Sequence, residues 1–340
     1  MQTPLAVFLV SSLVFSALAA PKKPCGDSLP IVYSPQYNIS LLGIEYIHPF
    51  DPKKYGKVYQ AISRDNNLCP QQFFMPTRVA DSELLLVHTP AYLDSLKTNS
   101  GLIARVGEMS FLSMVSAPYL YRKILEPMRL ATGGTILGGR LALRYGWAIN
   151  LGGGYHNASS DRGQGLSFFA DVPIAVHSLW KETPDLKVLI IDLDAHLGDG
   201  NARILGRDPR VAIFDMFDKG FRARDSDAVK LVKYPVRLEK KTATSTYLDS
   251  LNKWLPVVLD AEKPGLIVYN AGTDIYEKDW IGEFSVSREG ILTRDTTVFF
   301  SAFRKKIPIL MVLSGGYDKK SWEIITRSVN AILSDRLGRK

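Results

Sequence analysis

The distribution of apolar residues constrains the fold of this chain more than any other feature. Five short apolar runs are separated by segments with helical spacing, and each run stops at a cluster of glycine and polar residues. Continuous apolar runs that alternate with helices are typical of a parallel sheet covered on both faces. The chain is therefore predicted to be an α/β protein. The five predicted strands are residues 147–151, 186–191, 211–214, 266–269 and 307–313.

Helical periodicity fills the intervals between these runs. Apolar residues recur every three to four positions in residues 172–180, 247–259 and 322–332, which predicts three of the covering helices. Ligands of open parallel sheets bind at the carboxyl ends of the strands. Because the unusual polar residues of this chain follow the predicted strands, that edge of the sheet is the candidate site.

The most informative polar cluster follows the second predicted strand. Asp192, Asp194 and His196 alternate along the chain, so in an extended backbone all three project from one face. Two carboxylates and an imidazole are ligand types of a divalent metal site. The alternative is a solvated strand end whose carboxylates cap the next helix.

A third metal ligand is expected from another strand end. A catalytic zinc takes three protein ligands and keeps one open position. Asp194 and His196 supply two ligands, and Asp274, after the fourth predicted strand, is the expected third. Taken without the other two residues, Asp274 would be interpreted as a helix N-cap.

Two further residues have the chemistry that hydrolysis requires. His156 follows a run of three glycines and is the candidate base for attack by water, with Asp192 as the acceptor that fixes its tautomer. Tyr317 follows two glycines and is a candidate hydroxyl donor to a developing oxyanion. Packing is the alternative role for Tyr317.

Composition is that of a globular protein, and the distribution of basic residues gives no reason to predict nucleic-acid binding. The 340 residues carry a net charge of +8, and 46% of them are hydrophobic, enough for a large core in one domain or two. The basic residues are scattered. Their densest groups, residues 304–306 and 336–340, lack interleaved aromatic residues, so no nucleic-acid binding is predicted.

The N-terminus indicates a leader sequence. Residues 5–20 are uncharged and almost wholly apolar, and Ala17-Leu18-Ala19 fits a signal-peptidase site. We therefore expect a signal peptide over residues 1–19 and a secreted or secretory-pathway protein, with an uncleaved anchor as the alternative. No later segment is predicted to span a membrane.

The chain has two cysteines, Cys25 and Cys69, which agree with passage through an oxidising compartment. A bond between them would contribute roughly 4 kcal/mol in the chain-entropy treatment. Two unrelated thiols are the alternative.

Ordered motifs give the chain a family resemblance. It resembles the zinc-dependent histone deacetylase family of the arginase/deacetylase fold, and within it the class IV, histone deacetylase 11-like group. The resemblance implies one three-layer domain over residues 20–340, with a central parallel sheet flanked by helices. It is carried by residues 37–40, 48–51, 85–89, 132–136, 146–150, 159–163, 268–275 and 308–317.

The resemblance assigns roles that agree with those inferred from the residues. It implies that Asp194, His196 and Asp274 hold Zn²⁺, that Tyr317 polarises the acyl carbonyl, and that Asp192 orients His156.

The resemblance also implies a substrate pocket and a second ion. Gly154, Gly165 and Leu166 would line the pocket, with the Gly165 carbonyl facing the substrate amide. A monovalent cation such as potassium would lie near Asp192, Asp194, His196 and Asp215.

The implied reaction is hydrolysis of N-acyl-lysine amides, with acetyl or longer fatty-acyl groups. The partner would be an acyl-lysine protein or a small acylated amine. A secreted location disfavours histones as substrates. Without a functional leader, the resemblance implies a nuclear or cytoplasmic protein.

One departure from the family pattern affects catalysis. The family has a second histidine where this chain has Asn157, and an amide cannot take and return a proton near neutral pH. Asp199, the partner of that missing histidine, is retained, while Leu166 replaces a phenylalanine that lines the family's tunnel.

Two functions from different classes remain open. One is a slow zinc amidohydrolase with His156 as the sole histidine base. The other is a pseudoenzyme that binds zinc and an acylated ligand without turnover. An arginase-like ureohydrolase would need ligands for a second metal, and that pattern is lacking.

Overall fold

The computed structural model describes residues 25–41, 43, 50–220 and 226–338. The expected signal peptide, residues 1–19, lies outside the described residues, as does the start of the 48–51 motif. Among the described residues, no helix combines the length and apolar character needed to cross a membrane.

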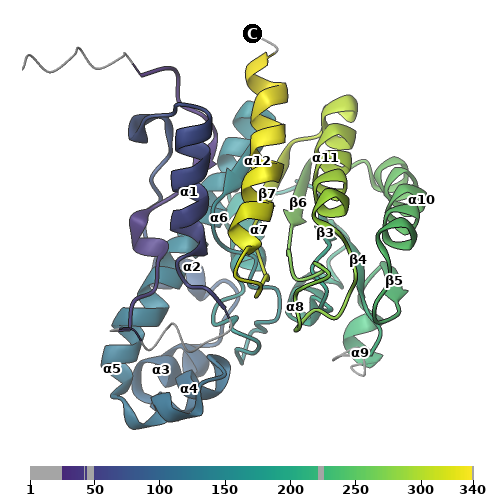
Figure 1. The fold of residues 1–340 in the computed structure, drawn as a ribbon. Helices are drawn as coiled ribbons and strands as arrows, with labels where there is room; N and C mark the ends of the chain where they lie inside the picture. The colour runs from purple at the N-terminus through teal and green to yellow at the C-terminus, as the bar shows by residue number, and fades with distance from the viewer. Residues whose placement is uncertain (1–24, 42, 44–49, 221–225, 339–340) are drawn as a thin grey trace, which may run out of the picture.

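The core of the fold is a seven-stranded parallel sheet, which confirms the predicted α/β architecture (Figure 1). The strand order is β1-β2-β7-β6-β3-β4-β5, and every pairing is parallel. The strands are β1 (Ile31–Val32), β2 (Trp147–Asn150), β3 (Val188–Asp192), β4 (Val211–Asp218), β5 (Tyr234–Leu238), β6 (Leu266–Asn270) and β7 (Ile309–Val312).

Helices cover both faces of the sheet because successive strand residues are apolar on alternate sides. Ile191 belongs to the core under one helical layer, and its neighbour Ile190 belongs to the core under the other. The first layer contains α1 (Lys54–Asp65), α10 (Thr244–Glu262), α11 (Arg288–Lys305) and α12 (Ser321–Gly338). The second contains α6 (Glu126–Tyr145), α7 (Asp171–Trp180), α8 (Asp199–Leu205) and α9 (Ser226–Val229).

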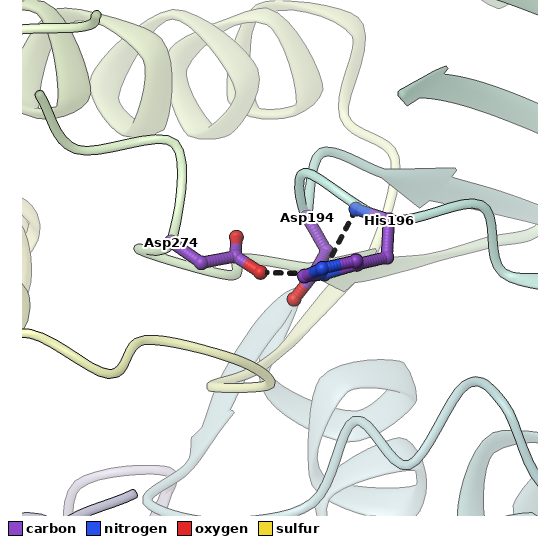
Figure 2. A group of neighbouring side chains, drawn as sticks. All are labelled: Asp194, His196 and Asp274. Atoms are coloured by element: carbon purple, nitrogen blue, oxygen red, sulfur yellow. Dashed lines mark hydrogen bonds and ion pairs between the residues drawn. The ribbon is translucent and has the colours of Figure 1, made fainter. Parts of the chain in front are cut away.

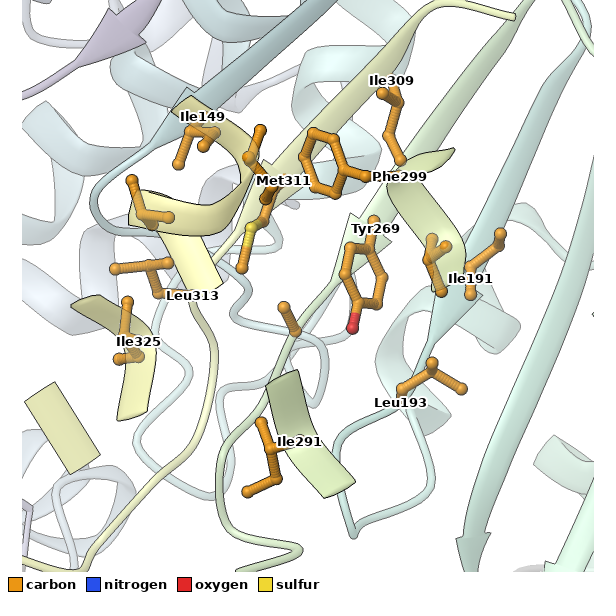
Figure 3. Packing of buried hydrophobic residues seen from close by; sticks show 14 of the residues in the cluster. Ile149, Ile191, Leu193, Tyr269, Ile291, Phe299, Ile309, Met311, Leu313 and Ile325 are labelled. Carbon is orange, nitrogen blue, oxygen red and sulfur yellow. The ribbon is translucent and has the colours of Figure 1, made fainter. Parts of the chain in front are cut away.

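The first layer shows how tightly helices and strands pack. Tyr269 of β6 and Met311 of β7 lie in one cluster with Phe299 of α11 (Figure 3). The rings of Tyr269 and Phe299 meet edge to face with centroids 6.4 Å apart. Such contacts fix α11 against the strands that carry the candidate site at their ends.

A third core lies under the short helices before α6. These are α2 (Asp81–Leu84), α3 (Pro90–Thr98), α4 (Ser100–Val106) and α5 (Ala117–Leu120), followed by a single π turn (Tyr121–Leu125). Short 3₁₀ turns occur at Pro35–Tyr37, Pro70–Gln72 and Ser110–Met114. This region forms one wall of the cavity described below.

Cys25 and Cys69 form a disulfide with Cα atoms 6.1 Å apart. The bond ties the start of the described chain to the loop after α1. Backbone hydrogen bonds continue the attachment, because Leu29 N donates to Gln72 O at 2.8 Å. Of the two alternatives left open by the sequence, the structure therefore has the paired cysteines.

The sheet order brings four strand ends together. β2, β7, β6 and β3 are consecutive neighbours, so the segments that follow them meet at one edge. These are the segments in which the sequence places the candidate site residues.

Candidate functional site

Asp194, His196 and Asp274 converge at the carboxyl edge of the sheet (Figure 2). His196 Nδ1 lies 3.0 Å from Asp194 Oδ1 and 2.9 Å from Asp274 Oδ2. One ligand atom from each residue lies within 4.8 Å of the others, and all three side chains are buried. The two loops that carry them are also bonded directly, since Ala195 N donates to Asp274 Oδ1 at 2.9 Å.

The turn after β7 encloses the two carboxylates. Gly315 N donates to Asp194 Oδ2 at 3.0 Å, and Ser314 Oγ lies 2.9 Å from the same oxygen. A Cβ at Gly315 would stand 2.5 Å from Asp194 Oδ2 and 2.7 Å from Asp274 Oδ2. Only glycine therefore lets the backbone approach this closely.

Electrostatics favour a cation among these three residues. Burial, reinforced by the charge of Asp194, raises the pKa of Asp274 to about 7. Burial also opposes ionisation of Asp194, but His156 and His196 outweigh it and hold the Asp194 pKa well below its usual value. Because two adjacent buried carboxylates need positive charge, a divalent ion fits this donor set.

His156 is held by Asp192, as the sequence predicts. Its Nδ1 lies 2.9 Å from Asp192 Oδ2, while Asn270 Nδ2 donates to Asp192 Oδ1 at 2.9 Å. The strand alternation expected through His196 does not continue, because β3 ends at Asp192. The Asp192 carboxylate is bonded to His156 and stands outside the ligand cluster.

Charge around His156 favours its protonated form. Burial lowers the pKa of the imidazole, but the carboxylates of Asp192, Asp194 and Asp215 outweigh burial and raise the pKa to about 10. A divalent ion held by Asp194 would offset part of that negative charge and lower this pKa.

The glycine turn before His156 is sterically required. Gly154 has a φ of +87°, and a Cβ there would stand 2.4 Å from Asn270 Oδ1 and 2.8 Å from Ser314 N. This close approach seats the turn after β2 against the ends of β6 and β7 and brings His156 to the site.

Asn157 is bonded to the residue expected to partner the missing histidine. Its Nδ2 donates to Asp199 Oδ1 at 2.8 Å and to Leu197 O at 2.9 Å. Gln164 Nε2 donates to the other Asp199 oxygen at 3.2 Å. Both amide protons of Asn157 are used, so its carbonyl oxygen is the polar atom left for a ligand.

Tyr317 lies close to the metal ligands. Its ring meets the His196 ring edge to face, with centroids 6.5 Å apart. Asp279 Oδ2 fixes the backbone by accepting from Tyr317 N at 2.6 Å and from Asp318 N at 3.1 Å. Burial and the carboxylates of Asp194 and Asp274 raise the pKa of the phenol well above 10, so the hydroxyl keeps its proton and remains a donor.

These groups line one cavity of about 910 Å³, its open mouth included. Gly154, His156, Asn157, Gly165, Leu166, Asp194 and Tyr317 all contribute to its wall. The apolar part of the wall is formed by Tyr37, Ile39, Leu41, Phe50, Pro52, Tyr55, Met109, Ile124, Met128, Tyr155 and Phe168.

Gly165 and Leu166 occupy the tip of a tight turn in that wall. Their φ angles are +54° and +60°, and Gln164 and Ser167 exchange backbone hydrogen bonds around them. Leu166 N donates to Val106 O at 3.0 Å, which anchors the turn to the end of α4. The Gly165 carbonyl accepts a hydrogen bond from Ser167 Oγ at 3.4 Å.

Asp215 lies beside this cluster on β4. Gly198 N donates to Asp215 Oδ2 at 3.0 Å, but Asp215 Oδ1 is buried and has no hydrogen-bond partner among the described residues. Burial and the neighbouring charge of Asp192 raise the pKa of Asp215 well above its usual value. An unpaired buried carboxylate oxygen fits the expected monovalent cation.

Three residues that support the site are not predicted from the sequence. Lys54 is fully buried, and its Nζ donates to Ser314 O at 2.7 Å and to Gly315 O at 3.2 Å. Burial lowers the pKa of Lys54 to about 8, although Asp274 and Asp194 oppose that shift. Ser314 and Asp279 complete the set. Ser314 belongs to the 308–317 motif and Lys54 lies just after the 48–51 motif, both of which carry the family resemblance. Asp279 lies in no such motif.

A parallel α/β sheet with a buried Asp–His–Asp ligand set beside an apolar cavity defines a metal-binding α/β protein. A sequence model of the histone deacetylase domain matches residues 48–333. The chain belongs to the histone deacetylase domain family, and the sheet with its flanking helices agrees with the arginase/deacetylase fold.

Three relatives illustrate the range of similarity. The chain is 40% identical over 303 residues to histone deacetylase 2 of Arabidopsis thaliana, covering 89% of this chain and 78% of that protein. It is 29% identical over 299 residues to an uncharacterized protein of Picosynechococcus, covering 88% of this chain and 95% of that protein. It is 26% identical over 295 residues to the acetoin utilization protein AcuC of Staphylococcus aureus, covering 83% of this chain and 75% of that protein.

Proposed function

We propose that this protein is a zinc-dependent hydrolase of N-acyl-lysine amides and belongs to the class IV, histone deacetylase 11-like group. The observation that carries the proposal is the convergence of Asp194, His196 and Asp274 beside His156 and Tyr317 in one cavity. Membership of the deacetylase family supports an acylated lysine as the substrate.

The residues around the ion have separable roles. Asp194, His196 and Asp274 hold zinc, which when bound supplies Lewis acidity toward the amide carbonyl and toward water. Tyr317 donates its hydroxyl to the oxygen that becomes negative as the carbonyl is attacked. His156, oriented by Asp192, accepts a proton from the attacking water and returns it to the leaving lysine amine.

The apolar wall supports acyl groups longer than acetyl. Leu41, Ile124 and Met128 are buried and line the cavity, where an acetyl group alone would bury only one methyl. Each additional buried CH₂ of a fatty-acyl chain contributes about 0.8 kcal/mol to binding. The acyl carrier is a protein lysine or a small acylated amine.

Asn157 is the reason to expect slow turnover. Its amide occupies the position of the family's second histidine and donates to Asp199 instead of exchanging protons with a ligand. His156 is then the sole histidine base. The same observation favours a second candidate function, a pseudoenzyme that binds zinc and an acylated ligand without hydrolysis.

The direct test uses zinc-loaded protein and a series of lysine peptides carrying acetyl to myristoyl groups. We expect slow hydrolysis that Tyr317→Phe slows further, with the highest kcat/KM for a longer acyl chain. Absence of hydrolysis with any peptide, alongside saturable peptide binding, would favour the pseudoenzyme.

We also propose that the buried Asp215 carboxylate and the backbone of residues 192–196 hold a potassium ion. The unpaired Asp215 Oδ1 supports this assignment. Potassium added to ion-depleted protein is expected to raise its melting temperature. The same protein with neither potassium nor sodium added is the control, and its melting temperature is expected to stay unchanged.

We further propose that residues 1–19 are a cleaved signal peptide and that the mature protein lies in the secretory pathway or outside the cell. The Cys25–Cys69 disulfide supports an oxidising compartment. N-terminal sequencing of the protein from its native source is expected to begin at residue 20. A chain that begins at Met1 in the nucleus or cytoplasm would contradict this proposal.

A further inference from the structure

Arg294 of α11 is a fully buried arginine that contacts both metal-ligand loops. Its Nη1 donates to Leu193 O at 3.0 Å and to Gly272 O at 2.6 Å, and its Nη2 donates to Ala271 O at 3.3 Å. Leu193 immediately precedes Asp194, and Gly272 lies two residues before Asp274. One guanidinium therefore bridges the backbones of the two loops from behind the site.

The positive charge of Arg294 is balanced by Asp295, which is not one of the metal ligands. Asp295 Oδ1 accepts from Arg294 Nε at 2.9 Å and lies 2.8 Å from Nη2. The Tyr269 hydroxyl donates to the same Asp295 oxygen. Because Asp295 satisfies the guanidinium charge, the remaining donors are free to bond neutral carbonyl groups.

Geometry distinguishes this residue from an ordinary core ion pair. A planar guanidinium presents five N–H donors in a fixed fork, so it holds several acceptors at set separations. Here the acceptors lie on the two segments that continue the paired strands β3 and β6 into the metal-ligand loops. Tyr247 Oη adds a hydrogen bond to Leu193 O at 3.3 Å from α10.

We propose that Arg294 is a positioning residue of the metal site, one that holds Asp194 and Asp274 at the spacing a single ion requires. The inference rests on the zinc site proposed above. Residues that orient metal ligands typically change metal affinity by 10- to 100-fold when they are replaced. Arg294 touches neither the cavity nor a ligand side chain, so its effect passes through the loop backbones.

The test compares zinc affinity in Arg294→Met, Arg294→Lys and a matched control. Arg129→Met is the control, because Arg129 is also a buried arginine that donates to a backbone carbonyl, Val79 O at 2.7 Å, and pairs with an aspartate, Asp81. It lies in α6 and contacts neither ligand loop. Zinc affinity is measured by competition with a chromophoric chelator, and melting temperature is measured in parallel.

We expect Arg294→Met to bind zinc about 10- to 100-fold more weakly than wild type. Arg294→Lys keeps the charge opposite Asp295, but with one of its three N–H donors on Asp295 it has too few left for all three carbonyls. It is therefore expected to fold and to show a smaller loss. Arg129→Met is expected to lose thermal stability without losing zinc affinity. The visible absorption of the cobalt-substituted protein should change in the Arg294 variants alone.

Two results would overturn the inference, and they are distinguishable. Wild-type zinc affinity in folded Arg294→Lys and Arg294→Met would overturn it while leaving the metal site intact. Failure of the wild type itself to bind zinc would overturn the metal site and this inference together.

Discussion

The Asn157 side chain lies against Asp199, with its Nδ2 2.8 Å from Asp199 Oδ1 and 2.9 Å from Leu197 O. The carboxylate that would orient an imidazole is therefore present and bonded to an amide. A histidine at position 157 would find the acceptor that its ring N–H needs. The neighbouring His156 already has the equivalent arrangement with Asp192.

Asn157→His should raise kcat toward acyl-lysine peptides by about 10²- to 10⁴-fold, because it restores a proton-transfer group next to the reacting atoms. Steady-state kinetics with zinc-loaded protein measure the change. Asn157→Ala serves as the control and should give no gain. Unchanged kcat in a folded, zinc-binding Asn157→His variant would show that position 157 does not limit turnover.

Tyr317→Phe should lower kcat by about 10²- to 10³-fold, since it removes one oxyanion donor and keeps the ring. The Tyr317 backbone stays bonded to Asp279, so zinc affinity should remain that of the wild type. Kinetics and chelator competition on the same preparation separate the two effects. A Tyr317→Phe variant with full activity would remove Tyr317 from the mechanism.

His88 should make the fold sensitive to acid. Its Nε2 accepts from Ala170 N at 3.0 Å, which requires a neutral ring with the proton on Nδ1. Burial lowers the pKa of His88 to about 4 from its usual 6.5, so below pH 6.5 the unfolded chain binds more protons than the folded one. This residue's contribution to the free energy of unfolding is complete above pH 6.5 and falls by about 3 kcal/mol as the pH drops to 4.

Urea unfolding at a series of pH values tests this expectation. His88→Gln removes the titrating group, and its free energy of unfolding should change less between pH 6.5 and 4 than that of the wild type. Parallel curves for the two proteins would show that His88 is not the source of the acid sensitivity.

Reduction of the Cys25–Cys69 disulfide should lower the free energy of unfolding by about 2–4 kcal/mol, because the bond restricts the unfolded chain. Urea titrations with and without reductant measure this loss. Cys25→Ser/Cys69→Ser should match the reduced wild type and show no further response to reductant. Equal stability of oxidised and reduced wild type would contradict this expectation.

Much of the fold was predictable because buried parallel strands have a recognisable apolar pattern. β1 was missed because two residues, Ile31 and Val32, are too few to form a pattern. β5 was missed because it is an edge strand with Pro235 and Arg237 exposed on one side. β4 runs four residues past its expected end, since Asp215 and Asp218 remain buried within the strand.

The candidate site was predictable where ligand types follow strand ends, as for Asp194, His196 and Asp274. Its supporting residues were not, because their contacts join distant parts of the chain. Lys54 reaches a carbonyl 260 residues away, and Arg294 reaches one 101 residues away. The spacing of apolar residues along a helix does not show that a single lysine or arginine in it is buried.

The most direct test of the account is the metal content of protein stripped with chelator and then titrated with zinc. Asp194, His196 and Asp274 should bind one zinc ion per chain, and Asp274→Asn should weaken that binding by at least 10-fold while the protein stays folded. Stripped wild-type protein that remains folded and takes up no zinc, or an Asp274→Asn variant that binds it equally well, would contradict the central claim.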